Sequence, residues 1–405
     1  MKKIIFTLSL FVGSIFVTAQ TNNLLSLQEF ENQVTTIGKA ISENLDSKNY
    51  DALEKLLNEV ITLCSRLSDE DKESVKALQA DIYYSLACVY SMQNRKEEAI
   101  NAFATCVNDW GYINYSLAKT DSDLDNIRNE KRFIELMESI REHGDYIYIL
   151  QQAGKYEKAD TAVLPHFKYE NASIQLLKEV KNLFNLDSIA GQGDEISKII
   201  NLMTWLHNTV RHDGSNYALC EFDVIDFYNY HKATGRGINC RGLAIALNEC
   251  YLAMGFKSRY ITCMPKNEKD TDCHVINSVY SETLQKWIWM DPTFNAYVKD
   301  ENGNLLSIAE VRERLISGKP TVLNEDANWN NEKPQTKEEY LDIYMTKNLY
   351  WLECMQVSKF NPESRYRNTD NTRIALLPLG YERSDIINNN KIVIVHDPEY
   401  FWQQP

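Results

Sequence analysis

The chain has 405 residues, of which 44% are hydrophobic and 25% are charged, a composition typical of a globular protein with roughly two or three domains. Its 57 acidic side chains outnumber its 43 basic ones and give a net charge of −14 at pH 7. The sequence therefore predicts no nucleic-acid partner, because neutralising phosphates requires a basic face. With 15 Gly and 9 Pro, the chain is neither collagen-like nor of low complexity.

The first residues have the pattern of a secretory signal peptide. Lys2 and Lys3 precede an apolar run over residues 4–17, and small residues then lead to Ala19 and Gln20. We expect residues 1–19 to be removed by cleavage near Ala19 and the protein to be exported, to the periplasm or beyond. No later apolar run approaches the roughly 20 residues that cross a bilayer, so we expect no membrane insertion.

Residues 20–165 are predicted to form a helical region, because apolar residues recur at spacings of three and four. One segment resembles a tetratricopeptide repeat in its order of large and small residues: Tyr83, Leu86, Ala87, Tyr90, Ala99 and Phe103. The two alanines would allow two helices to approach closely. Such repeats bind peptides or dock on a neighbouring domain, and both roles stay open. A further helical fragment is expected at residues 154–159, before a domain boundary near Pro165.

Residues 166–405 are predicted to form an α+β domain with an antiparallel sheet. A helix after Asp194 leads into a polar loop, and from Gly235 onward one helix is followed by strand-like runs with turn signals between them. In the C-terminal extension, residues 337–353 have a helical pattern and residues 392–395 a strand pattern. We expect this extension to be structural, since it offers no evident chemistry.

Cys240 is predicted to lie in the first turn of a buried helix. An apolar stripe follows it at helical spacing, formed by Leu243, Ala244, Leu247, Cys250, Tyr251 and Met254. Gly255 is a natural end for this helix. Free amides and the helix dipole at a helix N-terminus stabilise a thiolate, so the position suits a cysteine nucleophile. The Cys240 amide is also a candidate donor for an oxyanion hole.

Two strand-like runs, residues 273–280 and 286–291, flank a polar turn and predict a β-hairpin. If the turn is centred between Glu282 and Thr283, His274 and Asp291 face each other directly, with Cβ atoms about 5 Å apart. A slip of one residue would place them on opposite faces of the sheet. In the predicted register, the carboxylate orients an imidazole that activates the Cys240 thiol.

The blocks that carry these three residues resemble the core of the transglutaminase-like superfamily over about residues 196–298. They are Gly237-Ile238-Asn239-Cys240-Arg241-Gly242, Gly255-Phe256-Lys257-Ser258-Arg259, His274-Val275 and Trp289-Met290-Asp291-Pro292-Thr293. The resemblance implies a papain-like α+β fold with Cys240 as nucleophile, His274 as general base and acid, and Asp291 as the orienting carboxylate.

The order of a signal peptide, helical repeats and such a core is similar to exported transglutaminase-like proteins of Bacteroidetes. Members of the superfamily often have an aromatic residue after the catalytic cysteine, or a tryptophan two residues after the histidine. This chain has Arg241 and Ile276 at those places, so substrate-side details do not transfer.

Other interpretations of the same residues carry less support. A zinc site formed by His212, Cys263, Cys273 and His274 lacks paired short spacings. The segment Asp300-Glu301-Asn302-Gly303 is typical of a hairpin turn rather than a calcium loop, which needs more oxygen ligands. We therefore expect no metal and no cofactor. Cys263 and Cys273 either pair or stay free, because connectivity is not readable from sequence.

Two functions remain open on the sequence alone. The first is cysteine-dependent acyl transfer on a peptide or protein amide, through a Cys240 thioester that water or an amine resolves. Hydrolysis is preferred over cross-linking, because bacterial relatives of this kind are commonly regarded as proteases or amidases. The alternative is a non-catalytic scaffold or peptide-binding protein, in which Cys240 and His274 are structural and the helical repeats bind a partner.

Overall fold

The computed structural model describes residues 24–158, 163–366 and 372–405, so the signal-peptide prediction lies outside the described residues. The chain divides into two compact units, Met1–Asp145 and Tyr146–Pro405. This division precedes the predicted boundary near Pro165, because helix α8 (Tyr146–Gln151) packs against α14 and α15 of the second unit. Among the described residues, no helix combines the length and apolarity needed to span a membrane.

The described part of the first unit is helical, as the sequence predicts. Its elements are α1 (Leu27–Asp46), α2 (Tyr50–Ser65), α3 (Asp69–Ser74), α4 (Lys76–Met92), α5 (Lys96–Asn108), α6 (Tyr115–Thr120), the short 3-10 helix η2 (Ser122–Leu124) and α7 (Lys131–Gly144). Ser26 and Glu29 form a capping box at the start of α1, and Asn49 caps α2.

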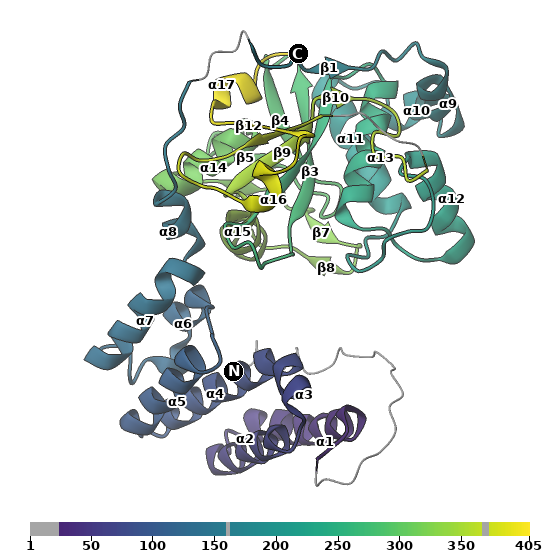
Figure 1. Ribbon diagram of the computed structural model, residues 1–405. Coiled ribbons are helices and arrows are strands. Elements are labelled where there is room, and N and C mark those ends of the chain that lie inside the picture. The colour runs from purple at the N-terminus through teal and green to yellow at the C-terminus, as the bar shows by residue number, and fades with distance from the viewer. Residues whose placement is uncertain (1–23, 159–162, 367–371) are drawn as a thin grey trace. The chain divides into compact units, whose positions relative to one another are not determined.

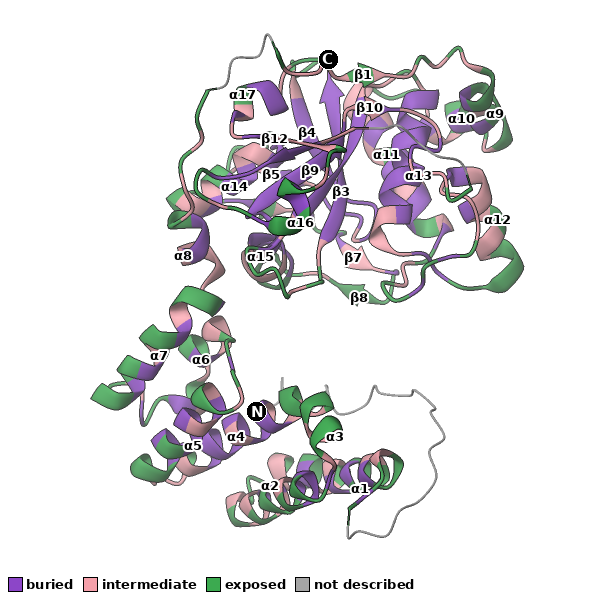
Figure 2. Cartoon of the chain, in the orientation of Figure 1, coloured by how far each residue is buried: buried purple, intermediate pink, exposed green. Residues whose placement is uncertain are grey.

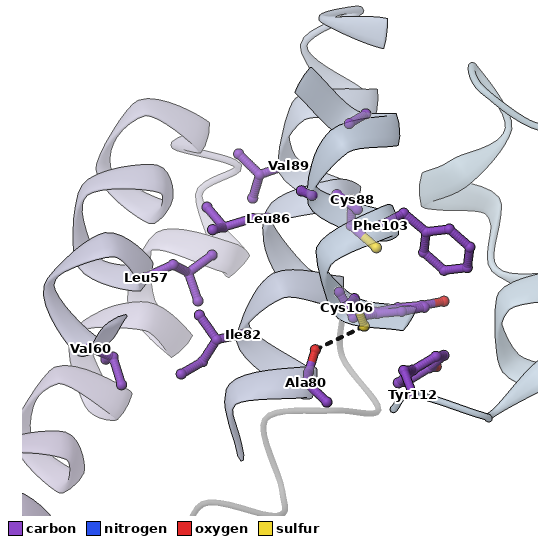
Figure 3. Packing of buried hydrophobic residues seen from close by; sticks show 14 of the residues in the cluster. Leu57, Val60, Ala80, Ile82, Leu86, Cys88, Val89, Phe103, Cys106 and Tyr112 are labelled. Carbon is purple, nitrogen blue, oxygen red and sulfur yellow. Dashed lines mark hydrogen bonds between the residues drawn. The ribbon is translucent and has the colours of Figure 1, made fainter. Parts of the chain in front are cut away.

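Helices α4 and α5 form the pair that the sequence relates to a tetratricopeptide repeat. Ala87, Ala99 and Phe103 are all fully buried. Figure 3 shows this packing, with Leu57 and Val60 of α2 facing α4. The Cys106 thiol donates to the Ala80 carbonyl at 3.1 Å, which joins the two helices. The helix pair is thus held by close packing, and its relation to the repeat family stays a prediction.

The second unit is an α+β domain, as predicted. Its remaining helices are α9 (Gln175–Leu183), α10 (Leu186–Ala190), α11 (Glu195–Thr209), α12 (Val224–Thr234), α13 (Cys240–Ala253), α14 (Ile308–Ser317), the π-helix η4 (Glu338–Met345), α15 (Thr346–Asn348), α16 (Ser384–Ile387) and α17 (Pro398–Phe401). Three short strand pairs lie outside the main sheet: β1 (Lys168–Tyr169) with β10 (Val357–Ser358), β5 (Val298–Lys299) with β6 (Val322–Leu323), and β7 (Asn328–Trp329) with β8 (Lys333–Pro334).

The main sheet has six strands in the order β12, β11, β9, β2, β3, β4. Figure 1 labels β12, β9, β3 and β4 among them. Their bounds are β2 (Ser258–Met264), β3 (His274–Ser281), β4 (Lys286–Met290), β9 (Trp351–Met355), β11 (Arg373–Leu376) and β12 (Ile392–Val395). All neighbours are antiparallel except β11 and β12, which are parallel. The predicted antiparallel sheet is therefore correct with one parallel edge.

Helices cover both faces of this sheet, so strand β3 is buried along its whole length (Figure 2). Val275 and Val279 of β3 pack into the core formed with α9 to α13, whereas Ile276 packs into the core formed with α14 and η4. This alternation is the two-residue period of a strand between two apolar layers. Helix α13 contacts β2 and β3, which brings its first residue beside the start of β3.

Two sequence predictions in this unit are wrong. Residues 154–158 are not helical, because their backbone pairs with the C-terminal part: the Leu379 amide donates to the Lys155 carbonyl and the Glu157 amide to the His396 carbonyl. The predicted helix at residues 337–353 ends at Asn348, and Trp351 begins strand β9. That strand lies between β2 and β11, so its pairing with both neighbouring strands favours an extended backbone over a helix.

Candidate active site

Cys240 is the first residue of helix α13, as the sequence predicts. The Asn239 side chain caps the helix by accepting the Gly242 amide at 3.0 Å. A side chain at Gly242 would meet Ile238 and Phe227 at 3.1 and 3.3 Å, so this glycine allows the helix start to pack closely. Cys240 itself is half-buried, and its amide has no acceptor within the helix. The sulfur thus lies at a well-packed helix N-terminus.

The β3–β4 hairpin exists, but its register differs from the prediction. Ser278 pairs with Trp289 and Ser281 with Lys286, which centres the turn between Thr283 and Leu284. His274 therefore has Cys263 of β2 as its partner and is not directly opposite Asp291. The difference from the predicted register is two residues, so both side chains stay on one face of the sheet.

His274 and Asp291 nevertheless meet through a short hydrogen bond. The His274 Nε2 lies 2.7 Å from an Asp291 carboxylate oxygen, and both side chains are buried. The same oxygen accepts the Tyr340 hydroxyl at 2.6 Å, while the other accepts the Thr293 amide at 2.8 Å. Trp289 in turn donates its indole N–H to Tyr340 at 3.1 Å. The carboxylate is thus fixed by donors, and His274 presents its Nδ1 edge to Cys240.

Aromatic rings enclose the imidazole of His274. The rings of Phe294 and Tyr344 lie 5.5 and 5.2 Å from it, centroid to centroid. Both are only partly exposed. They restrict the rotation of His274 and keep water from its Asp291 bond, which strengthens the charge interaction there.

The pKa of the Cys240 thiol is lowered in this setting. Burial opposes ionisation, but hydrogen bonds from His212 and His274, the His274 charge and the Val275 amide outweigh it and lower the pKa of Cys240 to about 6. Burial likewise disfavours protonation of His274, yet the charge and hydrogen bond of Asp291, together with Cys240, raise the pKa of His274 to about 10. The site therefore favours a thiolate beside an imidazolium at neutral pH.

The other cysteines differ from Cys240 in this respect. In each of them burial raises the pKa of the thiol: Cys64, Cys88, Cys106, Cys220, Cys250, Cys263, Cys273 and Cys354. All nine fall within the described residues and are free thiols, so Cys263 and Cys273 are unpaired in this structure. Among them, Cys240 alone has a lowered pKa.

A second histidine, His212, lies on the other side of Cys240. It belongs to the loop after α11, whose backbone pairs with Ile238. Its Nδ1 accepts the Trp329 indole N–H at 2.9 Å. The sequence suggests His212 only as a member of a zinc set, but here its ring is engaged with Trp329, and the ring of His274 with Asp291. Trp329 and Tyr340 come from the extension expected to be structural, and no local signal links either to the site.

Arg241, the residue after Cys240, donates to Glu363 at 2.7 Å and to the Thr262 hydroxyl at 3.1 Å, so it anchors a later segment of the chain. The Asp300 side chain accepts the amides of Asn302 and Asn304. With Gly303 at a φ of +85°, this is the predicted hairpin turn.

The chain is similar to known proteins over part of its length. Residues 184–292 match the family model of the transglutaminase-like superfamily, which places a transglutaminase-like domain there. No curated protein matches the chain. A solved structure of a proposed cysteine protease from Cytophaga hutchinsonii is 18% identical, with a TM-score of 0.24; the match covers 42% of this chain and 57% of that one. At this TM-score the likeness carries no weight for fold or function.

Proposed function

We propose that the transglutaminase-like domain catalyses cysteine-dependent acyl transfer from a peptide or protein amide. Cys240 is the nucleophile, His274 the general base and acid, and Asp291 the group that orients His274. The observation that carries this proposal is the contrast among the cysteines. Only Cys240 meets a charged histidine, a second hydrogen-bond donor and a backbone amide at a helix N-terminus.

The reaction follows from the positions of these groups. The Cys240 thiolate attacks the amide carbon, which forms the C–S bond and moves the carbonyl electron pair onto oxygen. His274 then gives its proton to the leaving nitrogen as the C–N bond breaks, leaving a thioester. Asp291 stays ionised and stabilises the imidazolium through the 2.7 Å bond.

The acceptor that resolves the thioester is water in the preferred form of this proposal. His274 removes a proton from the incoming water and keeps it, while the C–S bond breaks and sulfur leaves as the thiolate, which restores the resting thiolate and imidazolium pair. An amine acceptor would follow the same steps and give a new amide. The two outcomes differ in their products, so one experiment separates them.

The test uses casein as a protein substrate together with a fluorescent primary amine. Peptide hydrolysis in ¹⁸O-labelled water yields labelled carboxylates, whereas amine transfer makes casein fluorescent. Loss of both in Cys240→Ala, with an unchanged melting curve, is the expected result. Cys273→Ala is the matched control, since that thiol is half-buried but its pKa is raised. A Cys240→Ala protein that retains full biological activity would support the scaffold alternative instead.

The proposal also includes export of the protein and a role for the helical unit. A signal peptide over residues 1–19 implies export of the bacterial type, which cell fractionation tests. The α4–α5 pair implies a protein partner or a docking role for the repeat-like helices. Its buried small residues support close helix packing but do not select between the two.

A further inference from the structure

We propose that His212 is a fixed N–H donor of the active site rather than a second base, and that Trp329 holds it in this form. Its Nε2–H donates to the Cys240 sulfur in the resting site and to the carbonyl oxygen when that oxygen becomes negative. The inference rests on the proposed function of Cys240 and gives a catalytic role to a residue that the sequence suggested only as a zinc ligand.

The tautomer of His212 follows from its partner. An indole N–H only donates, so the His212 Nδ1 that receives it at 2.9 Å must offer a lone pair. A neutral imidazole with a free Nδ1 carries its proton on Nε2. The Nε2 edge is therefore the donor available to Cys240, whose pKa is lowered by hydrogen bonding with His212.

The backbone of His212 is clamped by the β7–β8 hairpin. The Asn330 side chain, which is buried, accepts the His212 amide at 2.8 Å and donates to the His212 carbonyl at 3.1 Å. Asn330 follows Trp329 directly, so one short hairpin fixes both the ring and the main chain of His212. Such double fixation is what a preorganised donor requires.

The loop is also fixed from the side of Cys240. The Ile238 amide donates to the Arg211 carbonyl at 2.9 Å, and the Asp213 amide to the Ile238 carbonyl at 2.8 Å. Gly237 makes this approach possible, since a Cβ there would lie 2.6 Å from the Arg211 oxygen. His212 is thus held in register with a residue two positions before the nucleophile.

The two histidines have opposite partners. His274 faces the Asp291 carboxylate, which accepts a hydrogen bond and favours the charged ring. The His212 Nδ1 accepts a hydrogen bond from an indole donor, which leaves the ring N–H on Nε2. During attack, the C–S bond forms and the negative charge moves from sulfur to oxygen. The Nε2–H of His212 then donates its hydrogen bond to that oxygen instead of to sulfur, and His212 transfers no proton.

The test compares two substitutions in the full chain. His212→Gln retains an amide N–H donor but has no basic nitrogen, whereas His212→Ala removes the donor. We expect His212→Ala to reduce the rate of thioester formation by about 10²–10³-fold and His212→Gln to stay within about tenfold of wild type. Melting curves of both variants check that the fold is retained.

A spectroscopic measurement gives a reading that does not depend on a substrate. In protein labelled with ¹⁵N-histidine, long-range correlations at neutral pH should show the His212 proton on Nε2. Trp329→Phe removes the indole donor and should shift the His212 ring toward the other tautomer. This substitution leaves Cys240 itself unchanged. A proton on Nδ1 in the wild type overturns the inference.

The outcomes separate this inference from the proposed function. If wild type forms the Cys240 thioester but His212→Ala is equally fast, or if the Gln variant loses as much as the Ala variant, the inference is overturned and the function stands. If wild type forms no thioester at all, the proposed function fails, and the tautomer measurement alone decides the state of His212.

Discussion

The two sides of Cys240 are built in different ways. On one side, strand β3 and the turn after β4 bring His274 to a buried carboxylate that is fixed by Tyr340 and Thr293. On the other, a loop and the short β7–β8 hairpin bring His212 to an indole donor. The comparison teaches that the partner of a ring nitrogen, rather than the residue type, assigns a histidine its role. The same imidazole is a base beside a carboxylate and a donor beside an indole.

The largest expected effect is that of His274→Gln, which is compared with the same substitution at His212. His274→Gln removes the base and acid and should lower the rate of thioester formation by about 10⁴–10⁶-fold, whereas His212→Gln should cost about tenfold or less. Single-turnover kinetics with mass spectrometry of the Cys240 peptide measures both. Equal losses in the two variants would erase the distinction between the sides.

Asp291→Asn should give the next largest loss. All three groups that contact this carboxylate are donors, so an amide NH₂ must meet at least one of them donor to donor. We expect a decrease of roughly 10²–10⁴-fold in rate, with His274 forced away from its productive tautomer. The ¹⁵N spectrum of His274 reports the tautomer directly. An Asn variant with wild-type rate would show that the carboxylate does not orient the ring.

Tyr340→Phe removes one hydrogen-bond donor of the Asp291 carboxylate and leaves the carboxylate itself in place. The Tyr340 hydroxyl donates to Asp291 and accepts from Trp289, so its removal leaves two buried polar groups short of a partner. The free energy of unfolding should fall by about 1–3 kcal/mol. Urea denaturation measures this change. Tyr344→Phe, which keeps its ring against His274, should remain within about 0.5 kcal/mol of wild type.

Gly237→Ala addresses the support of the other side. A Cβ 2.6 Å from the Arg211 carbonyl and 2.9 Å from the Asp213 amide forces the His212 loop to move, at a cost of about 1–3 kcal/mol in stability. Gly38→Ala in α1 is the matched control, because no atom lies within 4 Å of its Cβ position and helix propensity should add about 0.5–1 kcal/mol. Thermal unfolding measures the change in stability of both variants, and we expect a loss for Gly237→Ala and a gain for Gly38→Ala. A neutral Gly237→Ala would mean that the loop is not tightly held.

The side of His274 is largely readable from the sequence. The helix start at Cys240 follows from local patterns, and so do strands β3 and β4. The predicted register is wrong by two residues because the Glu195 carboxylate, from the start of α11, accepts the Ser281 hydroxyl and the Glu282 and Thr283 amides. That contact fixes a longer turn, with Gln285 at a φ of 51°. The period of two keeps His274 and Asp291 on one face despite the error.

The side of His212 is not readable in the same way. His212 lies in a polar loop, and Trp329 and Asn330 follow it by more than a hundred positions in the chain. Their meeting depends on the β7–β8 hairpin folding back over that loop, which leaves no periodic pattern. Tyr340 belongs to a helical pattern expected to be structural, and its contact with Asp291 is likewise long-range. Contacts of this kind carry no signal in a single sequence.

The most direct test of the central claim is the pH dependence of alkylation at Cys240, resolved from the other cysteines by peptide mass spectrometry. A lowered pKa populates the thiolate at lower pH, so the rate should rise through pH of about 6 and then stay level, since His274 keeps its proton until about pH 10. The buried thiols should react only at much higher pH, and His274→Ala should move the Cys240 midpoint upward. A wild-type midpoint near the ordinary thiol pKa of about 8.5, unchanged in His274→Ala, would contradict the thiolate and imidazolium pair.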